Sequence, residues 1–307
     1  MKPAAEFFLR TAAGRFSVVE YGGSGKDCLL IHGTGQNALA WKAAAKDLAR
    51  KYHVVALDLR GHGQTPEDSS EAQQYWRDIG PIASALNLER PVLIGHSTGA
   101  YAATAYVASG GDASAIVCVD GFTLDEPNSS DTATEQKKWN DAEALFSMFR
   151  YGWIATATER DRYLDEVVAA SPTDPLNAGV EPELLRAMLK RCFFERDGFF
   201  LRRPTLEEID IVSQSSPDAT VAPDRDVYDR VSIPLLLVWA RHGLSSGRHR
   251  ELRQIAEARA GRALISIDAS HNVPMQHPTE LAKLICSGLE ALVGTDRAVF
   301  SERARQG

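Results

Sequence analysis

The stretch Gly95-His96-Ser97-Thr98-Gly99 follows the apolar run Pro91-Val92-Leu93-Ile94 and precedes a run of small residues. A Gly-x-Ser-x-Gly pattern between a strand and a helix is typical of a tight turn that strains the serine backbone. Such a turn places the hydroxyl at a helix N-terminus, where free N–H groups stabilise negative charge. The pattern also fits an ordinary glycine-rich turn, so its meaning depends on the rest of the chain.

Size and composition restrict the class of protein. The chain has 307 residues, of which 44% are hydrophobic and 24% charged, and its formal net charge is −7. This length allows one large domain or a core with an inserted subdomain. The negative balance argues against nucleic acid or an anionic membrane surface as the main partner. We therefore expect a small-molecule substrate, and the sequence leaves the oligomeric state open.

The sequence favours a cytoplasmic location. No apolar stretch approaches the roughly 18 residues that cross a bilayer, and the first ten residues contain no long apolar segment typical of a signal peptide. The four cysteines are far apart and include no Cys-x-x-Cys pair. Cys28 and Cys118 lie in apolar, strand-like runs, so we expect buried, reduced thiols there.

Short apolar runs bounded by glycine, proline or aspartate recur, and several are continuous, as expected for strands covered on both faces. The predicted strands are residues 16–20, 28–31, 53–57, 91–94, 115–119, 233–239 and 263–267. The predicted helices between them are residues 38–51, 70–86, 98–109, 248–260 and 278–293. This alternation predicts an α/β fold with a mainly parallel sheet and helices on both sides.

Residues 121–230 interrupt this alternation, because about 110 residues between two strands far exceed an ordinary connection. The segment is rich in aromatic residues and shows helical periodicity at residues 134–148, 155–170, 181–194 and 205–214. We predict a helical cap, or lid, inserted into a core formed by residues 1–120 and 231–307. Most of its aromatic side chains should form the cap's own core, and a minority should face the cleft.

Two further loops surround the serine in this prediction. Residues 29–35 end a strand in a glycine-containing turn, and the N–H of Thr34 could pair with that of Thr98 to hold a developing oxyanion. The loop Asp58-Leu59-Arg60-Gly61-His62-Gly63 ends another strand, and we expect its polar side chains to brace backbone groups rather than to react. Candidate substrate contacts are His32, His96, Phe122 and Trp153.

His271 lies just past the last predicted strand and before the final helix. Histidine as a residue type titrates near neutral pH, which suits it to take the Ser97 hydroxyl proton and return it to a leaving group. With a strained serine upstream, we predict that His271 is the catalytic base. His277, at a helix start, is expected to pack or cap.

These segments resemble the α/β-hydrolase superfamily over nearly the whole chain outside the cap. The resemblance rests on His32-Gly33, on Asp58-x-Arg60-Gly61-His62-Gly63, on Gly95-x-Ser97-x-Gly99 and on Ser270-His271. It implies an eight-stranded, mostly parallel sheet, a cap over the cleft, and neither a metal nor an organic cofactor. It is specific for the superfamily but not for a substrate.

The resemblance fails at the usual position of the catalytic acid. Many members carry an aspartate after the penultimate strand, in a segment like Trp-Gly-x-x-Asp, but Gly243 occupies that place here. No carboxylate follows until Glu251, inside a predicted helix.

The preceding strand offers a replacement, because Asp120 directly follows residues 115–119. The lactonases that open zearalenone-type rings, and the haloalkane dehalogenases with a glutamate at this place, look similar. A carboxylate there could accept the imidazole N–H and stabilise the imidazolium. We predict Asp120 as the acid, with Asp125 as second choice. Asp268 is disfavoured because it lies too close in sequence to His271.

A hydroxyl at position 97 excludes the relatives that attack with a carboxylate, namely haloalkane dehalogenases and epoxide hydrolases. We predict a serine hydrolase that cleaves an ester or lactone of a small, fairly apolar molecule through an acyl-enzyme. Amide, thioester and carbon–carbon hydrolysis use the same groups and stay open. One alternative is a cofactor-free dioxygenase of the same fold acting on a heteroaromatic substrate. Another is a non-catalytic ligand-binding protein, which would need neither Ser97 nor His271.

Overall fold

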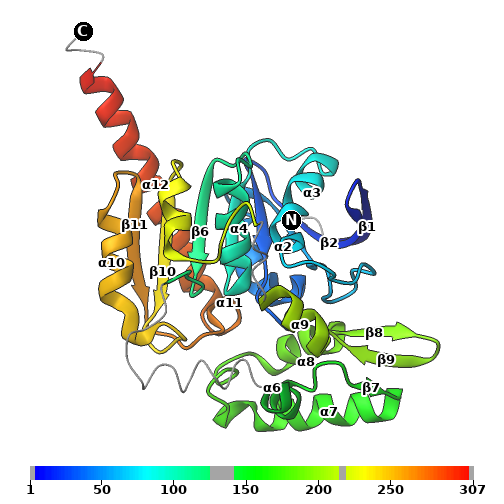
Figure 1. Ribbon diagram of the computed structural model, residues 1–307. Helices are drawn as coiled ribbons and strands as arrows, with labels where there is room; N and C mark the ends of the chain where they lie inside the picture. Colours follow the sequence, from blue (N-terminus) through cyan, green and yellow to red (C-terminus); the bar gives the residue numbers. More distant parts are fainter. Residues whose placement is uncertain (1–3, 125–141, 214–218, 304–307) are drawn as a thin grey trace.

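The computed structural model describes residues 4–124, 142–213 and 219–303 of the protein. An eight-stranded sheet of order β1-β2-β4-β3-β5-β6-β10-β11 forms its centre (Figure 1). The strands are β1 Ala5–Thr11, β2 Gly14–Gly22, β3 Lys26–Ile31, β4 Tyr52–Leu57, β5 Val92–His96, β6 Ala115–Val119, β10 Leu235–Ala240 and β11 Arg262–Ile267. Strand β2 is antiparallel to both of its neighbours, and the other pairs are parallel. The predicted fold class is confirmed.

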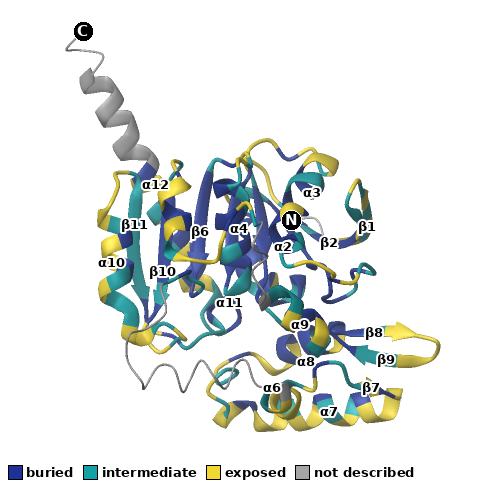
Figure 2. Ribbon diagram, viewed as in Figure 1, coloured by how far each residue is buried: buried dark blue, intermediate teal, exposed yellow. Residues whose placement is uncertain are grey.

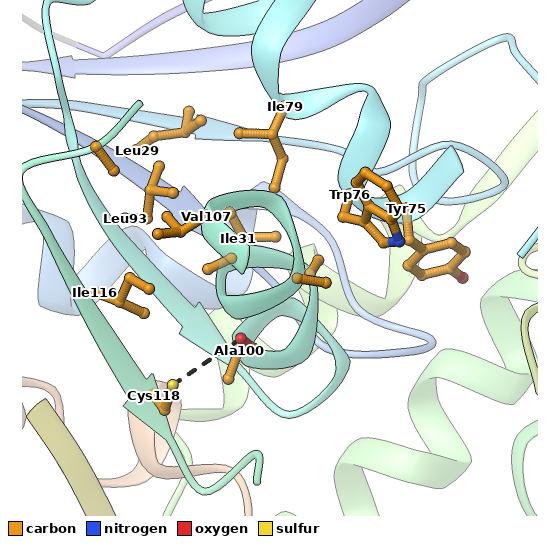
Figure 3. Close-up of a cluster of buried hydrophobic side chains, with 14 of the residues drawn as sticks. Leu29, Ile31, Tyr75, Trp76, Ile79, Leu93, Ala100, Val107, Ile116 and Cys118 are labelled. Carbon is orange, nitrogen blue, oxygen red and sulfur yellow. Dashed lines mark hydrogen bonds between the residues drawn. The ribbon is translucent and has the colours of Figure 1, made fainter. Parts of the chain in front are cut away.

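Helices cover both faces of this sheet, which explains the continuous apolar runs. The core helices and 3-10 turns are η1 Ala38–Trp41, α1 Lys42–Leu48, α2 Gln74–Arg77, α3 Ile79–Ala85, α4 Thr98–Ala108, η3 Arg225–Arg230, η4 Ser246–Arg248, α10 His249–Glu257, α11 Val273–Gln276 and α12 Pro278–Arg303. Successive strand residues point to opposite faces. Leu29 and Ile31 of β3 pack on the side of α2, α3 and α4 (Figure 3), whereas Cys28 and Leu30 pack on the side of α1 and α12. Figure 2 shows the central strands as buried.

The cap lies between β6 and η3 in the chain, and Figure 1 shows its described elements gathered together at one end of the core. Its elements are α6 Ala142–Phe149, β7 Ile154–Ala155, α7 Ala157–Ala170, η2 Ser171–Thr173, α8 Pro182–Arg191, β8 Phe193–Arg196, β9 Phe199–Arg202 and α9 Leu206–Ser213. Strands β7, β9 and β8 form a small antiparallel sheet. The cap is therefore mixed rather than purely helical as predicted.

The difference arises from a β-hairpin where a helix was predicted to run through residue 194. Helix α8 ends at Arg191, and β8 and β9 are joined by Asp197 and Gly198. Both turn residues have positive φ, 54° and 81°, which suits a two-residue hairpin turn. The part of the first predicted cap helix that precedes Ala142 lies outside the described residues.

Two core elements also differ from the prediction. Strand β1 was not predicted, and it pairs along its whole length with β2 at the edge of the sheet. The predicted helix 70–86 is divided into α2 and α3.

Across the described ranges, every helix is too short or too polar to cross a bilayer. The four cysteines are free and buried.

A buried ion pair joins the cap to the core. Arg191, at the end of α8, donates from Nε to Asp58 Oδ2 at 3.0 Å and from Nη2 to Ser17 Oγ at 2.8 Å. Asp58 also accepts the N–H groups of Ala38 and Gln64, each at 2.8 Å. The carboxylate thus braces the loop after β4, as predicted for this position, and neutralises the cap arginine.

Replacing Arg191 by methionine should therefore destabilise the protein. The variant leaves the Asp58 charge fully buried without its cation, so we expect the free energy of unfolding to fall by about 3–5 kcal/mol. Chemical denaturation with matched m-values would measure this. The control is Arg186→Met on the same helix, since Arg186 pairs with the exposed Asp165 and should change stability by less than about 1 kcal/mol. Equal effects of the two variants would contradict the structural role of Arg191.

Candidate active site

Ser97 occupies the turn between β5 and α4. Its backbone has φ 52° and ψ −124°, a conformation that L-residues rarely adopt. The turn is closed so tightly that side chains do not fit beside it. A Cβ at Gly95 would lie 2.2 Å from the carbonyl oxygen of Gly99, and a Cβ at Gly99 would lie 2.3 Å from that of Ile31. The glycines of the Gly-x-Ser-x-Gly motif are therefore required by close approach of backbone.

Asp120 and His271 meet beside this turn, although 151 positions separate them in the chain. Asp120 directly follows β6, and His271 lies in the loop between β11 and α11. Asp120 Oδ2 lies 2.7 Å from His271 Nδ1, and the aspartate side chain is fully buried. A carboxylate at this nitrogen fixes the ring so that Nε2 is left as the proton acceptor.

The Asp120 carboxylate packs against the loop after β10. The N–H of Leu244 donates to Asp120 Oδ2 at 3.2 Å, while Oδ1 is buried without a hydrogen-bond partner among the described residues. A Cβ at Gly243 would lie 2.1 Å from Oδ2. The carboxylate from β6 thus fills the space beside the position where many relatives carry their acid. A side chain at position 243 and the present Asp120 exclude each other sterically.

A side chain at position 243 should therefore impair catalysis. In Gly243→Ala, the added methyl must displace the Asp120 carboxylate from His271, and we expect kcat to fall by about 100-fold, the usual effect of a misplacement of about 1 Å. Gly247→Ala, in the same loop, is the control, because a Cβ there meets nothing within 4 Å. Steady-state kinetics of both variants on an ester would measure the difference, and a fully active Gly243→Ala would contradict it.

Other acidic residues near the end of the sheet are engaged elsewhere. Asp268 is exposed and lies 3.0 Å from His242 Nε2. Glu251 forms an ion pair with Arg248. Asp125, the second choice from the sequence, lies outside the described residues.

Two residues that line the cavity with Ser97 have main-chain N–H groups without a hydrogen-bond partner in the described part of the chain. Thr34 lies in the loop after β3, and Thr98 is the first residue of α4. Among the described residues, neither amide donates a hydrogen bond, whereas their hydroxyl oxygens lie 2.6 Å apart. Both residues line the same cavity as Ser97. Free amides at a helix N-terminus and in an adjacent loop can stabilise an oxyanion.

A chain of amide side chains supports the His271 loop. His96 Nε2 donates to the carbonyl oxygen of His271 at 2.8 Å, and His96 Nδ1 lies 3.0 Å from the side-chain amide of Gln36. Gln36 in turn donates to Asn272 at 2.9 Å, and Asn272 to Asn177 of the cap at 3.3 Å. Burial lowers the pKa of His96 well below its usual range. Sequence reasoning missed the three amides, because no motif marks them.

The remaining predicted contacts are divided between cavity and core. His96 lines the cavity with Ser97, and Phe122 lines a neighbouring one. His32 is fully buried, and its ring nitrogens bond the backbone of Leu59 and Gly33, at 2.9 and 2.8 Å. Burial also lowers its pKa to about 4. His32 is thus structural, and its prediction as a substrate contact is wrong. Trp153 packs edge-on against aromatic rings of the cap and does not line either cavity.

The histidine of the loop after β4 has a structural role. His62 is buried, its Nδ1 donates to the carbonyl oxygen of Arg60 at 2.9 Å, and its ring contacts Tyr75. Arg60 itself pairs with the buried Asp78 at 2.8 Å. Within the described ranges, no group of three or more histidine, cysteine, aspartate or glutamate side chains could hold a metal ion.

Two cavities meet at Ser97. The first has a volume of about 310 Å³ and lies between the core and the cap. It is lined by Ser97, His271, Thr34 and Thr98, by apolar cap residues that include Leu145, Phe149, Met188 and Leu189, and by Tyr151 and Arg202. The second, of about 420 Å³, shares Ser97, Thr34 and Thr98 and adds Phe122, Tyr101, Val212 and Pro223. A substrate centred on Ser97 could therefore extend in two directions.

The arrangement can support nucleophilic chemistry. It combines a strained serine, an imidazole oriented by a buried carboxylate, and two free amides around one cavity. No hydrogen bond joins Ser97 Oγ to His271 within the described part of the chain, and such bonds often close only when substrate binds.

Comparisons with known proteins agree with the fold. The model of the Alpha/beta hydrolase family matches residues 28–284. An uncharacterized protein of Mycobacterium tuberculosis is 36% identical over 99 residues, which are 32% of this chain and 28% of that protein. Protein phosphatase methylesterase 1 of Mus musculus is 39% identical over 97 residues, 29% of this chain and 25% of that protein. The chain thus matches only about a quarter of the length of these curated relatives.

Solved structures match over nearly the whole chain. E-2-(acetamidomethylene)succinate hydrolase has a TM-score of 0.70 at 19% identity, covering 94% of this chain and 99% of that one. A thermophilic esterase from Thermogutta terrifontis has a TM-score of 0.62 at 18% identity, with coverage of 94% and 99%. A thioesterase domain from the curacin biosynthetic pathway has a TM-score of 0.66 at 20% identity, with coverage of 92% and 99%. Since the family match spans most of the sequence, the chain belongs to the Alpha/beta hydrolase family.

Proposed function

We propose that this protein hydrolyses an ester or lactone of a small molecule, with Ser97 as nucleophile, His271 as general base and Asp120 as the supporting acid. The observation that carries the proposal is the 2.7 Å contact between Asp120 and His271 at the edge of the cavity that Ser97 lines. Relatives that are named as esterase, methylesterase and hydrolase fit this proposal.

In the first half of the reaction, Ser97 Oγ attacks the carbonyl carbon while His271 Nε2 takes the hydroxyl proton. The N–H groups of Thr34 and Thr98 stabilise the oxyanion, and Asp120 stabilises the imidazolium. The tetrahedral intermediate expels the alcohol oxygen, which receives the proton from His271. An acyl-enzyme on Ser97 is left.

In the second half, water attacks the acyl carbon and gives its proton to His271. The second tetrahedral intermediate releases the carboxylic acid, and the proton returns from His271 to Ser97 Oγ. The cap stands over this centre and limits the substrate to a small molecule. The apolar cap side chains that line the first cavity favour an apolar body next to the ester group.

A covalent probe tests the proposal. A fluorophosphonate should add once to the protein, and peptide mass spectrometry should place the adduct on Ser97. A p-nitrophenyl ester that acylates Ser97 faster than the acyl-enzyme is hydrolysed should give a burst of p-nitrophenol equal to the enzyme concentration. Ser97→Ala should show neither, whereas Ser109→Ala, at the other end of α4, should show both.

The same experiment separates the alternatives. Oxygen consumption with a heteroaromatic substrate and an unlabelled Ser97 would favour a cofactor-free dioxygenase over a hydrolase. Tight ligand binding that persists in Ser97→Ala, together with no turnover in the wild type, would favour a binding protein.

A further inference from the structure

Arg202 is a buried cation in the wall of the proposed substrate cavity. It is the last residue of β9, it is 2% exposed, and it lines the cavity that Ser97 and His271 also line. Among the residues that line this cavity, no carboxylate is present and Arg202 carries the one fixed positive charge. A buried charge is costly unless an opposite charge or several hydrogen bonds compensate it.

Arg202 differs in this respect from the other buried arginines. In the described part of the chain, four of them form ion pairs with carboxylates: Arg60 with Asp78, Arg160 with Asp161, Arg191 with Asp58, and Arg203 with Asp68 and Glu208. Arg202 forms none there, although it is adjacent in sequence to Arg203. The missing partner is therefore not a general feature of the cap.

The neighbours of Arg202 satisfy only part of its guanidinium. Nη1 donates to the carbonyl oxygen of Arg203, and Nη2 donates to that of Gly35 at 3.4 Å, while Nε has no hydrogen-bond partner in the described part of the chain. The guanidinium lies 5.2 Å from the ring centre of Tyr151 and 5.9 Å from that of Phe193. Such ring contacts favour a cation but do not neutralise it.

Among the described residues, the ionisable groups that act on Arg202 include no carboxylate. The nearby groups are the Cys192 thiol and the phenols of Tyr151 and Tyr163, the last of which accepts a hydrogen bond from Arg202. Burial raises the pKa of the Cys192 thiol and that of the Tyr151 phenol above their usual ranges. No group of the protein thus supplies the opposite charge within the described residues.

We propose that the substrate supplies it: Arg202 binds a carboxylate of the substrate, so the preferred substrates are anionic esters or lactones. This inference rests on the ester or lactone hydrolysis proposed above. A guanidinium fork matches the two oxygens of a carboxylate. A single cation in a cavity of about 310 Å³ balances one negative charge, which favours a carboxylate over a phosphate dianion.

The position of Arg202 also limits the distance between the two groups of the substrate. Its Nη2 contacts Gly35, the residue after Thr34, whose amide is proposed to hold the oxyanion. The carboxylate and the scissile carbonyl would therefore lie near the same loop, separated by a short chain. The apolar side chains of the cap would cover that chain.

Matched substrates test the inference. Monomethyl glutarate and 4-acetoxybutanoate place one carboxylate on the acyl or on the alcohol side, and each has a neutral isostere in which a carboxamide replaces the carboxylate. We expect the wild type to prefer the carboxylate of at least one pair by about 100-fold in kcat/KM, as for a desolvated charge pair. Arg202→Met should lose this preference, Arg202→Lys should keep part of it, and the surface variant Arg186→Met should keep all of it.

A binding measurement is independent of turnover. Glutarate, but not inorganic phosphate, should raise the unfolding temperature of the wild type and leave that of Arg202→Met unchanged. Without ligand, Arg202→Met should unfold at the same or a higher temperature than the wild type, because an unpaired buried charge is removed. Arg203→Met, which leaves Glu208 without its cation, should unfold at a lower one.

The outcomes separate this inference from the proposed function. Equal kcat/KM for both members of each pair, with Ser97 labelled by fluorophosphonate, would overturn the role of Arg202 and leave the hydrolase proposal intact. Stabilisation by phosphate instead of glutarate would overturn the carboxylate assignment. If Ser97 is not labelled but glutarate still binds through Arg202, the anion site stands and the hydrolase proposal fails.

Discussion

Ser97→Ala is expected to lower kcat for ester hydrolysis by about 10⁶-fold, as removal of the nucleophile does in other serine hydrolases. The reason is that the remaining groups cannot form the acyl-enzyme, so His271 could at most activate a water molecule to attack the carbonyl of the bound substrate. Residual activity would come from binding and from the two free amides of Thr34 and Thr98. Steady-state release of p-nitrophenol, measured at low enzyme concentration for the wild type and at high concentration over hours for the variant, covers this range.

The control for this prediction is Ser109→Ala, which removes a hydroxyl at the far end of the same helix, where Ser109 Oγ donates to the carbonyl oxygen of Tyr106. Its kcat should equal that of the wild type. A Ser97→Ala protein that retains a tenth or more of wild-type turnover, and whose circular dichroism is unchanged, would mean that the serine does not attack the substrate.

Asp120→Asn is expected to lower kcat by about 10⁴-fold without loss of fold. An amide at this place no longer stabilises the imidazolium, and its NH₂ group can turn His271 to the tautomer whose Nε2 carries the proton. The loop after β10 offers no substitute carboxylate at the contact with Asp120, because Gly243 has no side chain and Leu244 contributes its N–H. Asp120 Oδ1 has no hydrogen-bond partner among the described residues. The substitution therefore breaks few hydrogen bonds, and the fold should be kept.

Asp268→Asn tests whether any acidic residue close to His271 in sequence would serve. Asp268 is exposed and faces His242 rather than His271, so kcat should not change. If Asp268→Asn were as damaging as Asp120→Asn, or if Asp120→Asn kept normal turnover, the assignment of Asp120 would be wrong.

Much of this site was predictable, because its parts are local in sequence. The strand before Gly95 and the helix after Ser97 are marked by an apolar run and by small residues, and this pattern fixes the turn. Position 120 was predicted from the resemblance, because Gly243 stands where many family members carry the acid and Asp120 directly follows the preceding strand. The structure adds the steric reason, because the Asp120 carboxylate occupies the space that a Cβ at position 243 would need.

The errors and omissions have physical causes of a different kind. The pair Asp197-Gly198 is typical of a turn, but the helical periodicity of residues 181–194 favoured a helix up to residue 194 instead of a strand. His32 was predicted as a candidate substrate contact, yet both of its ring nitrogens form hydrogen bonds with backbone groups. No sequence pattern marks Arg202, because its significance depends on the absence of an ion pair with a carboxylate among the described residues.

A double-mutant cycle measures whether Asp120 and His271 act with Ser97 as one catalytic unit. The measurement is kcat/KM for one activated ester in the wild type, Asp120→Asn, His271→Ala and the double variant. We predict that Asp120→Asn costs about 10⁴-fold in the wild type and almost nothing once His271 is absent, because residues that act as a unit are strongly non-additive. Equal losses in both backgrounds would contradict the account, since Asp120 would then act without His271.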